Sequence, residues 1–409
     1  MSSEIFTTLG GLLGGLAVFI FGMNLMSEGL QKAAGERMRQ ILSVLTKNPI
    51  IGVLAGALVT AVLQSSSATT VMVIGFVSAG LMSLPQAVSV ILGANIGTTM
   101  TAQIIAFKID DFIWPLVFIG FVLYFFPKKE QVKNIGQTIF AFGLLFVGIN
   151  TMSSVMKPLA SSPVFLDMIG YVGHIPVLGV LTGTLMTLVV RSSSATIAVL
   201  QNFASQPMAD GVTSILGLTG AIPILLGDNI GTTITALLAS VGQPRQAKRT
   251  ALAHCFFNIS GACIFIWIVP WYAQFIQWIS PKGNEVDVIA RQIANAHTCF
   301  NIIMTLIWLP LLPVLVKLVM KVLPNKEIAE VPEYEPRFLD NNVRHLPSAA
   351  LNLTRNELVR IGQYVADMAH VACVGFIFGA DEKMEKVYEL EDIVDILQDK
   401  TTNYLSSLC

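Results

Sequence analysis

The sequence predicts an all-α, polytopic membrane protein: two inverted-topology repeats, one extra C-terminal span and a helical tail in the cytoplasm. Each repeat is expected to hold three spans and one re-entrant helical hairpin. Three observations predict this fold: few charges, apolar stretches that are long or interrupted by polar clusters, and an internal repeat. Of the 409 residues 54% are hydrophobic and 12% are charged, whereas soluble domains carry about 25% charged residues. We therefore expect the lipid bilayer, and no nucleic acid, as a partner.

The charged residues divide the chain into two parts. Residues 324–409 hold 8 Lys+Arg and 15 Asp+Glu, whereas the 323 residues before them hold 17 and 11. This predicts a membrane domain that ends near 323 and an acidic segment outside the bilayer. Within that segment we expect a Pro-rich linker over 324–348 and a helical tail over 349–409, with amphipathic helices near 349–377 and 383–406.

The apolar pattern predicts seven spans and two hairpins. Spans are expected near 5–28, 84–107, 112–126, 135–156, 213–240, 250–276 and 296–320. The stretches 50–81 and 175–206 carry polar clusters in the middle, so each is predicted to be two half-helices that enter the membrane and turn back. Thirteen Lys and Arg residues lie in alternate loops and after the last span, against four in the loops between them. This bias predicts a cytoplasmic tail and an external N-terminus.

Self-comparison finds the same three segments twice, in the same order. Residues 52–69 match 179–196, residues 92–102 match 226–236, and residues 22–27 match 148–153. An odd number of spans in each copy turns the second copy upside down, an arrangement typical of secondary transporters. We assign residues 1–133 to repeat 1 with its hairpin at 50–81, residues 134–294 to repeat 2 with its hairpin at 175–206, and residues 295–323 to a final transmembrane helix.

The polar clusters of the two hairpins have the chemistry of an ion site. They read Gln64-Ser65-Ser66-Ser67-Ala68-Thr69 and Arg191-Ser192-Ser193-Ser194-Ala195-Thr196. At such a break the N-terminus of a half-helix favours an anion, while hydroxyl and carbonyl oxygens suit a hard cation. The matching segments 93–101 and 227–235 add glycines and further oxygen donors. The alternative is that Ser, Thr and Gly only pack helices closely, which the duplication of both motifs disfavours.

Other repeated polar residues leave two interpretations open. Asn24 and Asn150 stand at matching places in the two copies, as site residues or as interhelical hydrogen-bond partners. Ala253-His254 with Phe257-Asn258 repeats as Ala296-His297 with Phe300-Asn301. A proton relay is one interpretation of these histidines, and polar contacts that join helices are the favoured one, so they stay outside the core site.

On these residues the sequence resembles the type II sodium–phosphate cotransporter family, in its bacterial form with a PhoU-like tail. The motifs that carry the resemblance are Gln64–Thr69 with Gly93–Thr99, and Ser192–Thr196 with Gly227–Thr233. The resemblance implies a multi-pass protein of the bacterial inner membrane that carries phosphate with sodium as coupling ion and needs no cofactor. It also implies hairpins that enter from opposite sides. The tail resembles the opening helices of a PhoU domain through residues 352–358 and 391–395.

The resemblance assigns substrate and ion binding to the two motifs. The expected set is Asn24, Gln64, Ser65, Ser66, Ser67, Thr69, Asn95, Thr98, Thr99, Asn150, Arg191, Ser192, Ser193, Ser194, Thr196, Asp228, Asn229, Thr232 and Thr233. Sodium would bind to a subset of eight residues: the six serines, Asn95 and Asn229. No catalytic residues are expected, because no nucleophile–base pair is evident, and a homodimer is left open.

Two residues of the second copy depart from the first. Arg191 replaces Gln64, and Asp228 replaces Ala94. Ionised groups inside the membrane are costly and tend to find opposite partners, so we predict that Arg191 and Asp228 form an ion pair.

The expected function is a sodium-coupled phosphate symporter that works by alternating access. Two alternatives stay open: a carrier or exporter of another small oxyanion, and a phosphate sensor that gates its cytoplasmic tail. An enzyme is not expected.

Overall fold

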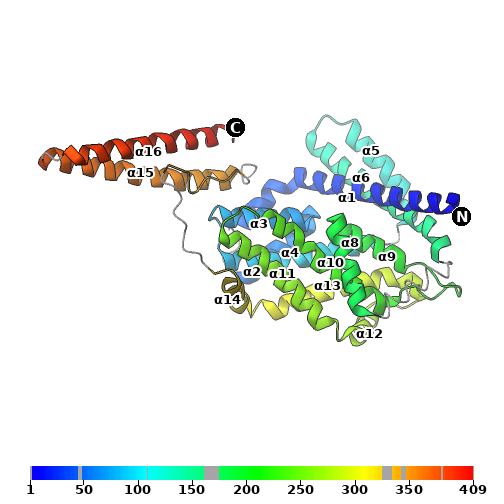
Figure 1. The fold of residues 1–409 in the computed structure, drawn as a ribbon. Helices are drawn as coiled ribbons and strands as arrows, with labels where there is room; N and C mark the ends of the chain where they lie inside the picture. The colour runs from blue at the N-terminus through cyan, green and yellow to red at the C-terminus, as the bar shows by residue number, and fades with distance from the viewer. Residues whose placement is uncertain are drawn as a thin grey trace.

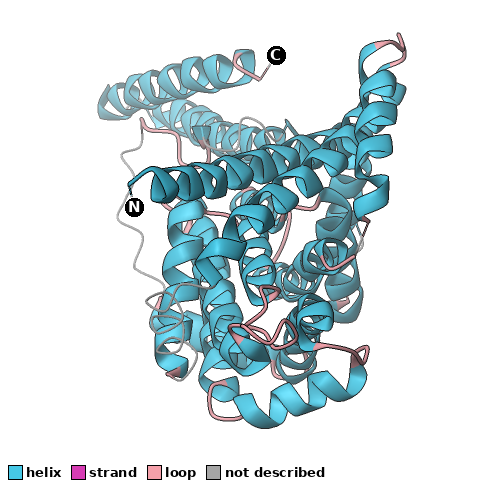
Figure 2. Ribbon diagram, turned by 90° about the vertical axis from the view of Figure 1, so that its right-hand side faces the viewer, coloured by secondary structure: helices cyan, strands magenta, loops and turns pink. Residues whose placement is uncertain are grey.

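Helices make up the regular structure of the computed structural model, which describes residues 2–44, 48–107, 109–160, 175–324, 334–341, 347–378 and 381–408. These residues form fifteen α-helices and one 3-10 turn, with no β-strand among them (Figures 1 and 2). The α-helices are α1 (Ser2–Val44), α2 (Pro49–Leu63), α3 (Ser66–Ser78), α4 (Leu84–Ile105), α5 (Ile113–Phe125), α6 (Glu130–Ala160), α8 (Pro176–Val190), α9 (Ser193–Ala204), α10 (Gly217–Ala239), α11 (Arg245–Phe265), α12 (Val269–Ile279), α13 (Glu285–Trp308), α14 (Leu312–Val322), α15 (Pro347–Phe378) and α16 (Asp381–Ser406).

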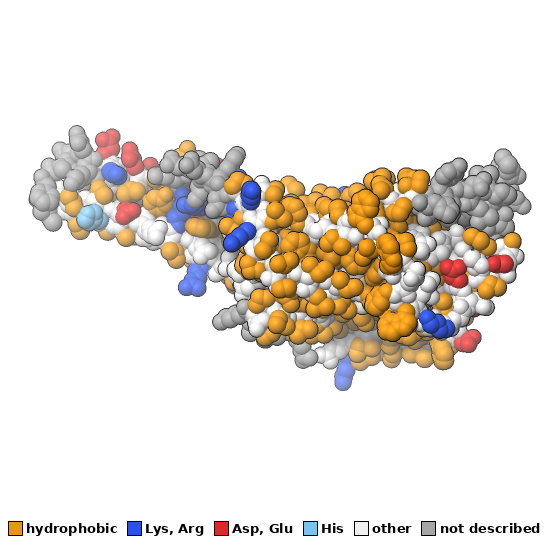
Figure 3. Space-filling model, turned by 90° about the horizontal axis from the view of Figure 1, so that it is seen from below, with side chains coloured by type: hydrophobic (Ala, Val, Ile, Leu, Met, Phe, Trp, Pro, Cys, Tyr) orange, Lys and Arg blue, Asp and Glu red, His pale blue; other side chains and the backbone are white. Residues whose placement is uncertain are grey.

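The all-helical, membrane-spanning character is confirmed, with fewer straight spans than predicted. Among the described residues, four helices are long and apolar enough to cross a bilayer, or six if each of two bent pairs is one span. The four are Thr7–Ala34, Leu84–Ile105, Glu130–Met156 and Gly217–Ala239. The stretch 112–126 forms α5, whose 13 residues are shorter than the roughly 20 that a span needs. Hydrophobic side chains dominate the face of the helical body seen in Figure 3, as a lipid-facing surface requires.

The last two predicted spans were wrong in shape, because each ends in a bend. Helices α11 and α12 meet at 95°, and α13 and α14 meet at 84°. Prolines at the start of α12 and α14 account for the breaks, since proline cannot continue a helix without losing a hydrogen bond. The expected final helix over 295–323 therefore begins earlier, at Glu285, and turns after Trp308. The boundary that we placed at 294 falls inside α13.

Both predicted hairpins are present as pairs of half-helices. Helices α2 and α3 are separated only by Gln64 and Ser65, and α8 and α9 only by Arg191 and Ser192. Each outer half-helix begins with proline, at Pro49 and Pro176, a residue that suits the first turn of a helix.

Glycines let each outer half-helix lie directly on a long helix of its own repeat. A side chain added at Gly93 of α4 would overlap the carbonyl oxygen of Val53 in α2. The same relation joins Gly227 of α10 to Val180 of α8. The backbones therefore touch at these two crossings, which is the packing that small residues allow in membrane helices.

The tail is an antiparallel pair of helices, α15 and α16, that projects from the body (Figure 1). Their bounds agree with the predicted amphipathic helices. The first turns of α15 rest on the end of the first hairpin, where Leu353 is buried among hairpin residues and the Asn352 carboxamide donates to the carbonyl of Ala79. The buried Glu357 carboxylate accepts from the backbone N–H groups of Arg337 and Phe338 at 2.8 and 2.7 Å, which ties part of the linker to α15.

Candidate functional site

The chain reverses at equivalent points of the two hairpins through a left-handed backbone conformation. Gln64 has φ 51° and ψ 28°, and Arg191 has φ 55° and ψ 26°. These are the only two non-glycine residues with positive φ in the part of the chain that the structure describes. Such a conformation is disfavoured for residues with a side chain and often marks a functional site. The side chains at both positions line the same cavity, described below.

A serine caps the inner half-helix directly after each turn. Ser65 Oγ accepts from the Ala68 N–H at 3.2 Å, and Ser192 Oγ accepts from the Ala195 N–H at 3.2 Å. Each cap satisfies one donor of the first turn. The remaining N–H groups and the positive end of the helix dipole stay available at the start of α3 and of α9.

Both helix starts open onto one cavity of about 180 Å³. It is lined by Met23, Asn24, Ser27, Gln64, Ser65, Ser66, Ser67, Thr98, Thr101, Arg191, Ser192, Ser193 and Ser194. Arg191 is its only formal charge. Two positive helix ends, a guanidinium and many hydroxyls thus share one small space, which is an environment for an anion with several oxygen atoms.

Sequence analysis did not predict three residues of the cavity wall: Met23, Ser27 and Thr101. Ser27 Oγ donates to the Leu63 carbonyl at 2.8 Å, and Thr101 Oγ1 donates to Gln64 Oε1 at 3.0 Å. Both contacts hold the first turn in place from α1 and α4. The signal was available, because Ser27 and Thr101 belong to the segments that are repeated.

The other predicted site residues lie outside the cavity wall: Thr69, Asn95, Thr99, Asn150, Thr196, Asp228, Asn229, Thr232 and Thr233. Thr69 and Thr196 are buried one layer behind it. Thr69 Oγ1 pairs with Thr60 Oγ1 at 3.0 Å, and Thr196 Oγ1 pairs with Thr187 Oγ1 at 2.9 Å. These equivalent contacts join the two halves of each hairpin.

Asn95 and Asn229 contact the repeated histidines instead of the cavity. His254 Nε2 lies 3.1 Å from Asn95 Oδ1, and His297 Nε2 lies 3.3 Å from Asn229 Oδ1. Because both oxygens are acceptors, each histidine donates from Nε2. The contacts fasten α4 to α11 and α10 to α13, in agreement with polar groups that join helices. A proton relay stays the alternative interpretation of these histidines.

The predicted ion pair between Arg191 and Asp228 is wrong. Asp228 is fully buried, with Oδ1 bonded to Thr187 Oγ1 at 2.6 Å and Oδ2 without a hydrogen-bond partner. Arg191 is exposed at the turn and lines the cavity. The two side chains form no hydrogen bond or ion pair with each other in the part of the chain that the structure describes, an outcome that sequence spacing does not reveal.

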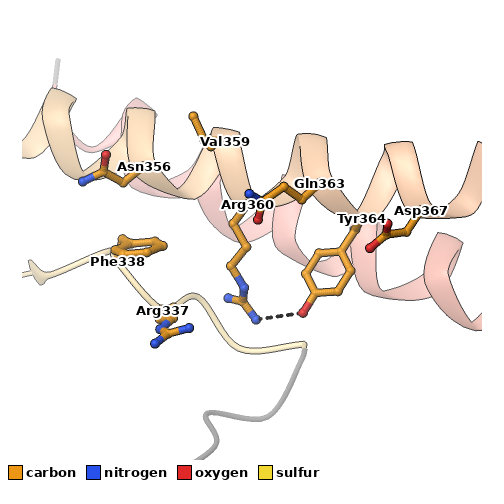
Figure 4. Close-up of a pocket in the computed structure, with 8 residues that line it drawn as sticks. All are labelled: Arg337, Phe338, Asn356, Val359, Arg360, Gln363, Tyr364 and Asp367. Carbon is orange, nitrogen blue, oxygen red and sulfur yellow. Dashed lines mark hydrogen bonds between the residues drawn. The ribbon is translucent and has the colours of Figure 1, made fainter. Parts of the chain in front are cut away.

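A larger hollow of about 550 Å³ lies on the tail, where Arg337 and Phe338 of the linker face α15 (Figure 4). The Arg360 guanidinium in this hollow is already paired, because it contacts the buried Glu357 carboxylate at 2.9 Å and lies near the Tyr364 hydroxyl. None of its residues belongs to a repeated motif. We therefore take the cavity between the hairpins as the candidate site.

An all-helical body with apolar spans, two broken helical hairpins and one polar cavity between them defines a polytopic membrane transporter. The chain belongs to the Na+/Pi-cotransporter family, whose profile matches residues 18–154 and 156–279. The family and the relatives that are named after phosphate transport or export indicate a transporter and not an enzyme.

Three relatives illustrate the range of the family. "Uncharacterized protein YqeW" of Bacillus subtilis is 34% identical over 308 residues, which are 75% of this chain and 96% of the relative. "Putative inorganic phosphate export protein YjbB" of Escherichia coli is 24% identical over 98% of this chain and 71% of its own length. "Sodium-dependent phosphate transport protein 2B" of Homo sapiens is 38% identical over 97 residues, which are 23% of this chain and 14% of that protein. No solved structure matches the chain.

Proposed function

We propose that this protein is a sodium-coupled symporter of inorganic phosphate across the bacterial inner membrane. Phosphate binds in the cavity between the two hairpins, and alternating access moves it across. One observation carries the proposal above the others: the N-termini of α3 and α9 and the guanidinium of Arg191 line one cavity. Family membership supports phosphate as the anion.

Hydrogen-bond donors explain why this cavity suits phosphate. Four hydroxyls of the inner half-helices, those of Ser66, Ser67, Ser193 and Ser194, line it beside Arg191. A phosphate offers acceptors on all sides, and a guanidinium donates two parallel bonds to it. Hydrogen bonds to a charged group contribute about 1.5–3 kcal/mol each.

Sodium coupling is supported by the name of the human relative and by the oxygen-rich wall. Hydroxyl and carbonyl oxygens are the ligands that hard cations prefer. We assign sodium to a subset of the serines of both motifs, close enough to the anion for each ion to favour binding of the other.

Uptake of labelled phosphate into proteoliposomes tests the proposal. With purified protein, an inward sodium gradient should drive accumulation, and an equal potassium gradient should not. Accumulation that is equal with both cations would reject sodium coupling. Absence of any flux would favour the phosphate-sensor alternative.

Export is the second candidate, because YjbB carries that function in its name. Efflux of preloaded phosphate distinguishes the cases. An exporter that is not driven by sodium should release phosphate at the same rate with and without a sodium gradient, whereas release by a sodium-coupled symporter should depend on the gradient. Competition by arsenate and sulfate in the same vesicles would show whether another oxyanion is preferred.

The two repeats are proposed to have inverted topology. Helices α3 and α9 start at one cavity, and Figure 1 draws α3 toward the tail side of the body and α9 toward the other side. The contact of α15 with the end of hairpin 1 supports entry of that hairpin from the cytoplasm.

Labelling of equivalent positions tests the inversion. Leu81 and Met208 follow the inner half-helices at matching places, and both are exposed. The variants Leu81→Cys and Met208→Cys are made in a background without exposed native cysteines. An impermeant maleimide added to intact cells should label only one of the two, and the other should react only after the membrane is permeabilised. Reaction of both from the same side would contradict inverted repeats.

Substitution of Arg191 tests the anion site. Arg191→Gln introduces the residue of the first repeat and should raise the phosphate concentration at half-maximal uptake roughly 10- to 100-fold, because one charge-assisted contact is lost. Arg191→Lys should fall between, since it keeps the charge without the planar fork. Arg355→Gln, on the exposed face of α15, is the matched control. Unchanged phosphate dependence in Arg191→Gln would exclude Arg191 from the site.

A further inference from the structure

Asp228 is a buried carboxylate with one oxygen that has no partner. Its side chain has no exposed surface, and Oδ2 lacks a hydrogen bond while Oδ1 contacts only Thr187. No Lys, Arg or His forms an ion pair with it within the described chain. An ionised carboxylate in a membrane protein is costly without a positive partner. Either a proton or a cation that is not a side chain must therefore neutralise this carboxylate.

The neighbouring hydroxyls supply more acceptor oxygens than protons. Thr187 Oγ1 lies 2.6 Å from Asp228 Oδ1 and 2.9 Å from Thr196 Oγ1, so its single proton serves only one of them. The Thr196 proton is directed to the Ser192 carbonyl at 3.3 Å. Lone pairs of the carboxylate and of a threonine hydroxyl thus remain unsatisfied at one place. Oxygen clusters of this kind are what a hard cation binds.

The first repeat contains the same hydroxyls without the carboxylate. Thr60 and Thr69 pair at 3.0 Å as Thr187 and Thr196 do, but Ala94 stands where Asp228 stands in the second copy. The extra negative charge therefore occurs at one of two otherwise equivalent positions.

The carboxylate is connected to the cavity through Thr187. The Thr187 carbonyl accepts the Arg191 N–H at 2.7 Å, and its hydroxyl contacts Asp228. Thr196 in turn contacts the backbone of Ser192, the cap of α9. A cation at Asp228 would therefore affect, through Thr187 and Thr196, the position of the turn that places Arg191 and Ser192 beside the anion.

We propose that Asp228, Thr187 and Thr196 bind one monovalent hard cation, separate from the cavity and present only in the second repeat. On the proposed function this cation is sodium, and its binding orders the Arg191–Ser192 turn. The inference rests on the proposed function only for the identity of the ion and for its effect on the anion.

Direct binding of sodium-22 to the purified full-length protein in detergent, without phosphate, tests the site. Asp228→Asn keeps the shape and removes the charge, and it should bind one sodium ion fewer per chain than the unmodified protein. Thr187→Val should weaken binding at least tenfold, whereas Thr60→Val, its counterpart in the first repeat, should leave this site unchanged. Size-exclusion profiles establish that each variant is folded, and Thr196→Val replaces any variant that is not.

The outcomes are distinct. Equal sodium stoichiometry in folded Asp228→Asn would overturn the inference, and so would absence of sodium binding by the unmodified protein. Release of one proton per chain when the pH is raised, seen in the unmodified protein, absent in Asp228→Asn and independent of sodium, would identify a protonated carboxyl and overturn it as well. If the unmodified protein binds sodium but carries no phosphate, the proposed function fails and the cation site stands.

Discussion

Gly93→Ala and Gly227→Ala are expected to prevent stable folding of the membrane domain. A methyl group at either position would overlap a backbone carbonyl of the outer half-helix, that of Val53 or of Val180. Backbone atoms of a helix cannot move aside as a flexible side chain can, so the hairpin would have to separate from α4 or α10. Overpacking commonly costs about 1–3 kcal/mol and sometimes more, and we expect a loss of at least ~3 kcal/mol here. Thermal unfolding in detergent and the yield of monodisperse protein measure the effect.

Gly14→Ala provides the matched control for this prediction. Gly14 lies in α1 with nothing within 4 Å of an added side chain. Alanine favours a helix over glycine by up to ~1 kcal/mol, so the control should be neutral or slightly more stable. Near-normal melting of both Gly93→Ala and Gly227→Ala would show that the hairpins are not packed in this way.

The second expected result is loss of phosphate uptake by more than a hundredfold in the double variant Ser66→Ala with Ser193→Ala. Both serines stand at the start of an inner half-helix and line the cavity. Each hydrogen bond to a charged ligand contributes about 1.5–3 kcal/mol, and ~1.4 kcal/mol corresponds to tenfold in affinity. Uptake at fixed, low phosphate measures the loss, with the amount of protein in the membrane determined on the same vesicles.

Ser154→Ala serves as control for the serine substitutions, because Ser154 is exposed on α6 and its hydroxyl bonds only within that helix. It should transport normally. The single variants should fall between the control and the double variant. Normal uptake by the double variant would remove these two serines from the site.

The hairpins could be predicted because the evidence for them is local and duplicated. A Ser-rich interruption between two apolar half-helices can only be a break, and its second copy excludes coincidence. Pro270 and Pro313 also indicate the bends after α11 and α13. The prediction from hydropathy alone nevertheless joined each bent pair into one span. Average apolarity over a window does not register the direction of the helix axis.

The sequence alone determined the helical membrane class, the two repeats, the hairpin breaks near Gln64 and Arg191, and the family, because periodicity, composition and repetition are properties of the chain itself. Which polar residues share the cavity depends on the packing of the helices, which the sequence did not reveal. This packing turned Asn95 toward His254 and kept Asp228 from pairing with Arg191, since the face that a helix presents depends on how it packs against its neighbours. Charge and motif spacing predicted candidate residues for a site. Which of these residues lie in contact depends on the packing of elements that are far apart in the chain.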